Sequence, residues 1–121
     1  MIDGLYIVKP SRVEFLQGTL DMLVLRTLAL RPLHGYGIAQ ALRHTTDAAI
    51  QVEAGSLYPA LQRLELQGLV TARWDVSEQN RRTRIYRLTA AGRKRLHAEM
   101  SRWESFVQAV ALVLHPKLIE E

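Results

Sequence analysis

The chain has 121 residues, the size of one ordinary domain with a hydrophobic core of its own. Hydrophobic residues make up 48% and charged residues 23%, a balance that excludes a disordered chain. Cysteine is absent and the four histidines lack a metal-binding spacing, so we expect no metal and no cofactor. No apolar run approaches the roughly 20 residues that span a bilayer, and the opening "MIDGLYIVKP" lacks the order of a signal peptide. We therefore expect a cytoplasmic protein without membrane association.

The net charge of +4 is concentrated in one segment. Residues 77–95 hold seven of the 16 Lys and Arg residues and one of the 12 acidic residues, so they carry +6 and leave −2 for the rest of the chain. Clustered Lys and Arg favour a polyanionic partner, because neutralising phosphates releases counterions from nucleic acid. The alternative is a solvated, highly charged hairpin tip, and charge alone leaves both open.

Residues 1–18 are predicted to be an N-terminal arm, because glycine and proline interrupt any long period, although residues 12–17 could form a short helix. A first helix is predicted to begin at Thr19 as N-cap and to stop at Pro32. Its apolar residues follow the helical spacing: Leu20, Leu23, Val24 and Leu28.

A second, short helix is predicted from about Gly35 to Thr45, where Ile38, Ala39 and Leu42 share one face. Gly35 lets the chain turn into this helix, and His34 is expected to cap it or to pack. A very short strand is predicted at residues 50–52.

A third helix is predicted to begin at Ser56 as N-cap, with Pro59 in its first turn and Gly68 in the left-handed position just past its end. Its buried stripe should hold Leu57, Ala60, Leu61 and Leu64. The remaining positions should point elsewhere: Ser56, Pro59, Gln62, Arg63 and Leu66.

Two β-like runs follow, over residues 69–76 and residues 83–89, and residues 77–82 separate them. In the first run Val70, Ala72, Trp74 and Val76 alternate onto one side. Together the runs predict a hairpin with a basic tip.

A long helix is predicted over residues 90–115, capped by Thr89 and followed by a tail at residues 116–121. Its apolar residues repeat with the spacing of a heptad seam: Leu96, Met100, Trp103, Val107, Val110 and Leu114. Such a helix either folds back onto its own domain or pairs with another chain. Its roughly 25 residues extend about 38 Å at 1.5 Å each, more than a small core can cover, so we favour a homodimer.

Three helices followed by a two-stranded hairpin form the order of a winged helix-turn-helix, a mainly α fold with a small β-hairpin. Residues 19–89 would be the DNA-binding domain and residues 90–115 the dimerisation helix. The third helix would enter the major groove of double-stranded DNA, and the hairpin would be the wing. Arg81, Arg82 and Arg84 would then lie where phosphates pass.

Three segments together resemble the PadR-like transcriptional regulators, over roughly residues 15–115: "GTLDMLVLRTLALRPLHGYGI", "VEAGSLYPALQRLELQGLV" and "NRRTRIYRLTAAGRKRL". The resemblance implies a winged-helix dimer, usually a repressor, whose C-terminal helix mediates dimerisation and which can respond to small hydrophobic or aromatic molecules. The single long C-terminal helix resembles the family's short subgroup. The first dozen residues are longer than the family leads us to expect.

In the family-like motif, Ser56, Tyr58 and Pro59 open the recognition helix and are expected near base edges or phosphates. Tyr58 could equally pack under the wing. Gln62 and Arg63 offer donors that suit adenine or guanine, or they are simply solvated. Arg81 and Arg82 are the stronger candidates, because a wing tip has no packing reason to be doubly cationic.

Arg93, Lys94 and Arg95 begin the last helix, where the helix dipole disfavours positive charge. A nearby phosphate would favour them there, and so would a carboxylate such as Glu99, a turn away from Arg95.

Trp103 is either a core residue or, at a two-fold interface, part of a slot for a flat ligand between two indoles. Met100, Phe106 and Val107 would line the same pocket, with Phe15 and Leu16 from the arm as covers. Leu96, Val110 and Leu114 are expected in the dimer interface.

These features predict a dimeric repressor that binds a palindromic operator with half-sites about 10 base pairs, or roughly 34 Å, apart. A winged-helix module that binds protein instead of DNA is the alternative. An enzyme is not expected, because paired carboxylates, a phosphate-cradling glycine loop and a nucleophile with a spaced base are all missing.

Overall fold

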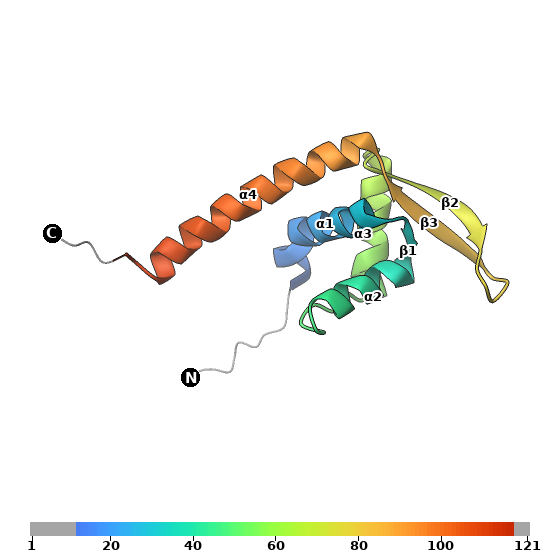
Figure 1. Ribbon diagram of the computed structural model, residues 1–121, viewed down its shortest axis with the longest axis horizontal. Helices are drawn as coiled ribbons and strands as arrows, with labels where there is room; N and C mark the ends of the chain where they lie inside the picture. Colours follow the sequence, from blue (N-terminus) through green and yellow to red (C-terminus); the bar gives the residue numbers. More distant parts are fainter. Residues whose placement is uncertain (1–11, 118–121) are drawn as a thin grey trace.

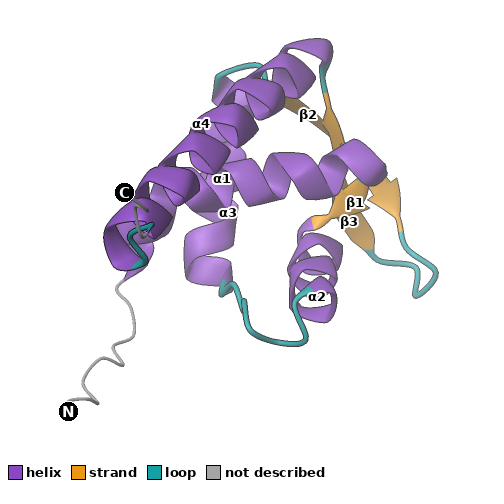
Figure 2. Ribbon diagram, turned by 60° about the vertical axis from the view of Figure 1, so that its left-hand side comes forward, coloured by secondary structure: helices purple, strands orange, loops and turns teal. Residues whose placement is uncertain are grey.

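The computed structural model describes residues 12–117, and of residues 12–17 it describes the backbone only. The elements, in chain order, are α1 (Arg12–Leu30), β1 (Leu33–His34), α2 (Gly35–Thr45), α3 (Ala54–Leu66), β2 (Val70–Val76), β3 (Arg82–Leu88) and α4 (Ala90–Leu114). The three strands form one antiparallel sheet in the order β1-β3-β2, at one edge of the helices (Figure 2). The predicted fold class, a mainly α winged helix-turn-helix with a long last helix, is confirmed.

The core lies where α1, α2 and α3 meet the base of the sheet. Its buried apolar side chains include Val24, Leu25, Leu28, Ile38, Leu42, Leu57, Leu61, Leu64, Val70, Tyr86 and Leu96. The predicted stripe on α3 is confirmed, since Leu57, Ala60, Leu61 and Leu64 are all buried. Burial of this stripe fixes α3 in the domain by one side and leaves its other side free of the core.

Helix α1 begins earlier than predicted. It runs from Arg12, so Thr19 lies inside the helix and is not its N-cap. Gly18 does not interrupt the helix as predicted. It is exposed with open space around it, and a glycine within a helix costs only about 1 kcal/mol relative to alanine. Packing with the rest of the fold outweighs that cost, as α1 packs against α2, α3 and α4.

Helix α3 also begins earlier than predicted. Glu53 is its N-cap, the backbone amides of Ser56 and Leu57 both donate to the Glu53 carbonyl, and Ser56 is therefore within the first turn. Pro59 lies inside the helix. The predicted end of α3 is confirmed, because Gly68 has a φ of 76°, a left-handed conformation that glycine adopts without strain.

The short strand predicted at residues 50–52 is wrong, because this segment is irregular. A different third strand, β1, pairs Leu33 with Tyr86 and His34 with Ile85. Two residues are too few for an alternating pattern to be visible in the sequence, so β1 could not be predicted.

The predicted hairpin is confirmed, and β2, β3 and the turn between them, residues 70–88, are called the wing below. Its register sets Trp74 opposite Arg84 and Val76 opposite Arg82. At the tip the amide of Ser77 donates to the Arg81 carbonyl at 2.7 Å, and Asn80 adopts a left-handed φ of 62°. The wing and α4 project from opposite sides of the helical cluster (Figure 1).

The start of α4 is fixed against the turn that leads into β2. The Thr89 hydroxyl caps α4 by accepting from the Gly92 amide at 2.9 Å, as predicted, and donates to the Gly68 carbonyl at 2.8 Å. Gly92 is buried so close to this turn that a Cβ there would overlap the carbonyl oxygen of Leu69. Only glycine lets the backbone of α4 approach the base of the wing this closely.

Gly92→Ala is expected to lower the free energy of unfolding by about 1–3 kcal/mol, because the new methyl group must displace backbone. The matched control is Gly18→Ala, also within a helix but in open space, which should raise it by about 0.5–1 kcal/mol. Urea denaturation followed by circular dichroism measures both. Equal effects of the two substitutions would contradict the close approach at Gly92.

Candidate nucleic-acid interface

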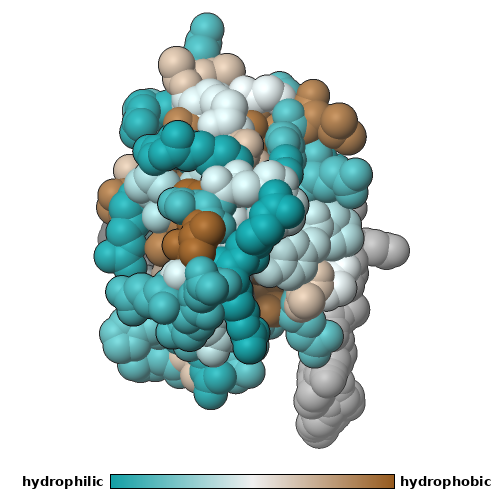
Figure 3. All heavy atoms as spheres, turned by 90° about the vertical axis from the view of Figure 1, so that its right-hand side faces the viewer, coloured by the Kyte–Doolittle hydropathy of each residue, from teal (hydrophilic) through white to brown (hydrophobic). Residues whose placement is uncertain are grey.

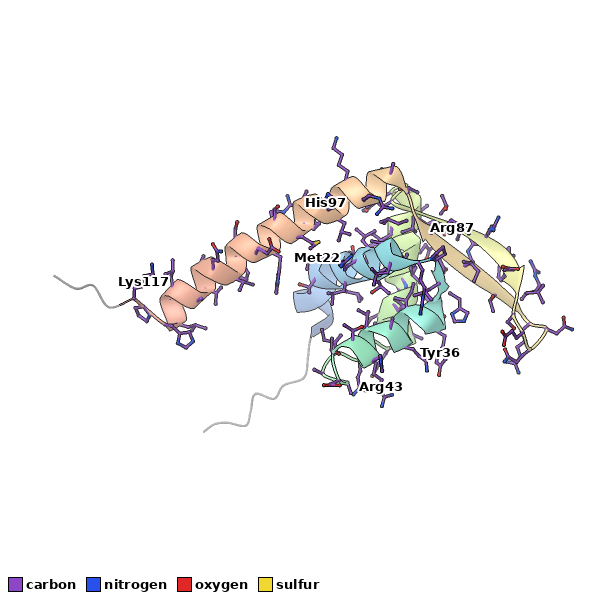
Figure 4. The ribbon with its side chains drawn as sticks, in the orientation of Figure 1. Met22, Tyr36, Arg43, Arg87, His97 and Lys117 are labelled. Carbon is purple, nitrogen blue, oxygen red and sulfur yellow. The ribbon has the colours of Figure 1, made fainter. Side chains whose placement is uncertain are left out.

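Helices α2 and α3 form the helix-turn-helix, and the start of α2 is fixed by His34. The His34 Nδ1 accepts a hydrogen bond from the Gly37 amide at 2.8 Å, so the predicted capping role is confirmed. Tyr36 and Arg43 project from α2 away from α1 (Figure 4). Tyr36 is 66% exposed, and its hydroxyl accepts from Gln40 at 3.0 Å.

Tyr58 connects the two helices of this motif. Its ring lies against Gly35, the first residue of α2, and fills the space that a Cβ at residue 35 would need. Even so, 47% of Tyr58 remains exposed. Glycine is therefore needed at residue 35 to admit the Tyr58 ring, and its backbone is not in the left-handed region that only a glycine turn would require.

The side of α3 that faces away from the core is only partly as predicted. Pro59 and Gln62 are exposed there, and Ser56 is half-buried. Leu66 is 81% exposed at the end of the helix. These side chains are therefore accessible to a partner.

Arg63 lies at the flank of this outward side and is not simply solvated, because it is bonded to α1. Its Nη2 donates to Asp21 Oδ1 on α1 at 2.8 Å, and the side chains of Arg63 and Asp21 are only 33% and 24% exposed. Its Nε is buried and has no hydrogen-bond partner among the described residues. The guanidinium is thus used to join α3 to α1.

Burial raises the pKa of Asp21 above its ordinary value of 3.8, although the hydrogen bond and the charge of Arg63 act in the opposite direction. Desolvation is the larger effect. The ion pair therefore positions α3 against α1 more than it stabilises the fold.

The arginines of the wing differ in their surroundings. Arg84 donates to Glu65 on α3 at 2.8 Å, and both side chains are 35% exposed, so this pair joins the middle of the wing to α3. Arg81 and Arg82 are exposed. Figure 3 looks onto the wing end of the molecule, where hydrophilic side chains surround small apolar patches.

Trp74 was missed as a functional candidate. It is 54% exposed on β2, and the guanidinium carbon of Arg82 lies 4.5 Å from its ring centroid. The sequence did contain a signal, because the apolar alternation of β2 continues through Trp74 and Val76 past the last residue that reaches the core.

At the start of α4, Arg93, Lys94 and Arg95 are exposed. The carboxylate of Glu99, which the sequence suggested as a partner of Arg95, pairs with Arg102 instead at 2.6 Å. The carboxylate that the sequence offers as the alternative to a phosphate is therefore bonded to Arg102, three residues further along α4.

The heptad seam of α4 divides into two parts. Leu96 is buried at 2% in the core of its own chain, so its assignment to a dimer interface is wrong, and Met100 packs partly on the same core. From Ser101 onward every described residue of α4 is exposed, including Trp103 at 42%. The large apolar residues of this outer half are Trp103, Phe106, Val107, Val110, Leu112, Val113 and Leu114.

The Trp103 and Phe106 rings lie 6.2 Å apart on this outer half. Trp103 is therefore not a core residue of its own domain. The side chains of Phe15 and Leu16, expected to cover it, lie outside the described part of the chain.

Two adjacent helices joined to a twisted hairpin, with the second helix held by one side, define a winged helix-turn-helix protein. The family described as "Transcriptional regulator PadR-like family" matches residues 24–98. The chain therefore belongs to the PadR-like family of transcriptional regulators.

Individual relatives agree with this family. Transcriptional regulator Rv3488 of Mycobacterium tuberculosis is 34% identical over 98 residues, which cover 80% of this chain and 87% of that protein. A PadR family transcriptional regulator from Eggerthella lenta has a solved structure that is 34% identical, with a TM-score of 0.72 over 87% of this chain and 89% of its own. A transcriptional regulator from Clostridium thermocellum is 26% identical, with a TM-score of 0.75 over 86% of this chain and 99% of its own.

Within residues 12–117, no helix is long and apolar enough to cross a membrane. In the same part of the chain, no three His, Asp or Glu side chains are grouped as a metal site requires.

Asp21→Asn is expected to gain stability relative to the parent protein as the pH rises above the ordinary pKa of an aspartate, 3.8. Because burial raises the pKa of Asp21, its contribution is complete below the ordinary value of 3.8 and is lost as the pH rises through the raised value. Asparagine does not ionise, and its carbonyl can still accept from Arg63.

Urea unfolding across this pH range measures the difference, with Glu104→Gln on the exposed side of α4 as the control. A difference between Asp21→Asn and parent that stays constant with pH, or that turns in favour of the parent, would contradict the dominance of burial.

Proposed function

We propose that this chain is a homodimeric transcriptional repressor that binds an approximately palindromic DNA operator and is released from it by a small hydrophobic or aromatic molecule. The observation that carries the proposal is the position of α3. Its apolar stripe is fully buried, and its opposite side is exposed next to a wing whose tip carries two exposed arginines. This is the arrangement in which a helix-turn-helix protein presents one helix to the major groove and a basic wing to the backbone.

The residues proposed to contact DNA are divided by what they touch. Gln62 and Pro59 are exposed on α3 and would face base edges, with the half-buried Ser56 and the Tyr58 hydroxyl beside them. Arg81 and Arg82 would bind phosphates. Arg63 and Arg84 are proposed to act indirectly, because each already donates to a carboxylate.

Arg93, Lys94 and Arg95 are proposed as further residues that bind phosphate. They are exposed at the N-terminal end of α4, where a positive charge is unfavourable beside the helix dipole, and Glu99 is engaged with Arg102. Their exposure and the engagement of Glu99 with Arg102 support a phosphate as partner, while the charge of Arg95 also interacts with the Asp21 carboxylate on α1.

The outer half of α4 is the proposed dimer interface. Trp103, Phe106, Val107, Val110 and Leu114 repeat along it with between 36% and 65% of each residue exposed in the single chain. A stripe this wide is more than a surface helix normally leaves in water. A second copy of α4 would cover it, and Trp103 with its symmetry mate would border the proposed effector site.

A function in transcription does not call for enzymatic activity, and we propose none. The winged-helix module that binds protein instead of DNA remains the second candidate function. It has difficulty explaining the exposed arginine pair at the wing tip, which a protein partner would need to match with buried carboxylates.

The DNA proposal is tested by fluorescence anisotropy with a labelled duplex from upstream of the protein's own gene and with a scrambled duplex, across a salt series. We expect preference for the upstream duplex and affinity that falls steeply with salt. Arg81→Ala/Arg82→Ala should reduce the slope of log K against log salt by about 0.9 for each phosphate that the variant no longer neutralises.

Arg26→Ala/Lys117→Ala, which removes one exposed cation from α1 and one beyond the end of α4, is the charge-matched control for that double variant and should leave the slope unchanged. Equal binding of both duplexes would count against a sequence-specific regulator. Retention of the full slope in Arg81→Ala/Arg82→Ala would count against the wing as the phosphate-binding element.

The dimer and its effector site are tested together with Val110→Glu in a Trp74→Phe background, where Trp103 is the one tryptophan left. Buried charge in an apolar interface is costly, so sedimentation should show a dimer for the background protein and a monomer for the variant. A planar aromatic probe such as acridine should change Trp103 emission in the dimer only. A monomeric background protein would refute the interface, and a flat titration of the dimer would refute the pocket.

A further inference from the structure

The face of β2 that packs on the core continues beyond the core. Along this face Val70 is 1% exposed and Ala72 is partly buried against the core, whereas Trp74 is 54% and Val76 59% exposed. An exposed indole on a two-stranded wing contributes little to the packing of the domain. Packing in the core therefore does not explain why a tryptophan stands at residue 74.

Two arginines of β3 share that face with Trp74. Arg84 is directly opposite Trp74, and Arg82 is one pair further toward the tip, opposite Val76. The guanidinium carbons of Arg82 and Arg84 lie 4.5 Å and 5.5 Å from the centroid of the Trp74 ring. Both distances are within the range of a cation–π interaction, for which tryptophan is the best of the aromatic side chains.

The two guanidinium groups differ in what their N–H groups do. Arg84 donates to Glu65 on α3 at 2.8 Å. Arg82 donates to no side chain or carbonyl within the described residues and pairs with no carboxylate there. Because stacking uses the flat face of a guanidinium and hydrogen bonds use its edge, Arg82 can stay against the indole and still donate to an anion.

We propose that Trp74 is a positioning residue that holds the Arg82 guanidinium ready to bind a phosphate of duplex DNA. This inference rests on the proposed function. Arg82 is a long side chain at an exposed site, and without the indole it would sample many rotamers and lose that freedom on binding. Stacking on Trp74 removes part of that freedom before DNA arrives.

The position of Arg82 relative to the groove is fixed through the same interactions. Glu65 near the end of α3 binds Arg84, Arg84 lies by the Trp74 ring, and the ring lies by Arg82. The phosphate that Arg82 reaches is therefore set by where α3 lies. The wing and the recognition helix would engage DNA as one unit.

The test measures the affinity and salt slope of parent, Trp74→Ala, Arg82→Ala and the double variant Trp74→Ala/Arg82→Ala, on the upstream and the scrambled duplex. Trp74→Ala is expected to weaken binding to both duplexes by about 2- to 5-fold for each wing, the equivalent of an exposed cation–π interaction. Its slope should fall in the same direction as that of Arg82→Ala.

The double variant separates positioning from direct binding. If Trp74 acts through Arg82, the double variant binds as well as Arg82→Ala alone, whereas still weaker binding would mean that the indole itself touches DNA and would overturn the proposal. Parent-like affinity and slope in Trp74→Ala would also overturn it.

Trp74→Phe is a second variant that should fold even if Trp74→Ala does not. Phenylalanine keeps an aromatic face at this exposed position, so this variant should retain most of the DNA affinity. If Trp74→Ala fails to fold, comparing Trp74→Phe with Trp74→Phe/Arg82→Ala gives the same decision. Val76→Ala, an exposed apolar neighbour on the same face, is the control and should bind as parent does.

The two duplexes distinguish failure of this inference from failure of the proposed function. Loss of preference for the upstream duplex, with the Trp74 effect intact, would refute the sequence-specific regulator and leave the positioning role. Preference for the upstream duplex without a Trp74 effect would refute the positioning role and leave the sequence-specific regulator. Absence of binding to either duplex at low salt would refute both.

Discussion

The structure depends on α3 being held from one side only. Leu57, Leu61 and Leu64 are buried against α1 and the base of the sheet, and the Arg63–Asp21 ion pair adds a directional interaction on the flank of that stripe. Because these interactions use one side of a helix that is 13 residues long, they determine the direction of the other side as well. Every DNA-binding role proposed for α3 follows from that orientation, since a rotation of the helix would bury Gln62 and expose the core.

The regular parts of the fold could be predicted from the sequence, because their signals are local. The stripe on α3, the left-handed Gly68 and the caps at His34 and Thr89 each depend on spacings of a few residues, and all are present. Two of the errors, at the start of α1 and at β1, occurred where a distant part of the chain outweighed a local preference. Gly18 did not end a helix that packs against three others, and β1 exists only because residues 85 and 86 offer it a partner strand.

The roles of the charged residues could be predicted less well, for the same reason. Arg63, Arg81, Arg82 and Arg84 are alike in sequence, yet Arg63 and Arg84 are bonded to acids that are 42 and 19 residues away along the chain. Nothing in the local sequence distinguishes an arginine with such a partner from one without. The apolar seam of α4 could not be divided from the sequence either. Its first residue, Leu96, belongs to the core, whereas its residues from Trp103 onward are exposed.

Thr89 is the single residue between the end of β3 and the start of α4, and its hydroxyl and Gly92 fix that start against Gly68 and Leu69. The long helix is thus a lever without a flexible joint at its base. The helix is about 38 Å long, so a rotation of roughly 10° about its C-terminal end would displace its N-terminal end, with the wing and α3 attached, by about 7 Å. In the proposed dimer, a small molecule that changes the angle at which two such helices cross would alter the separation of the two α3 helices while leaving each domain internally unchanged.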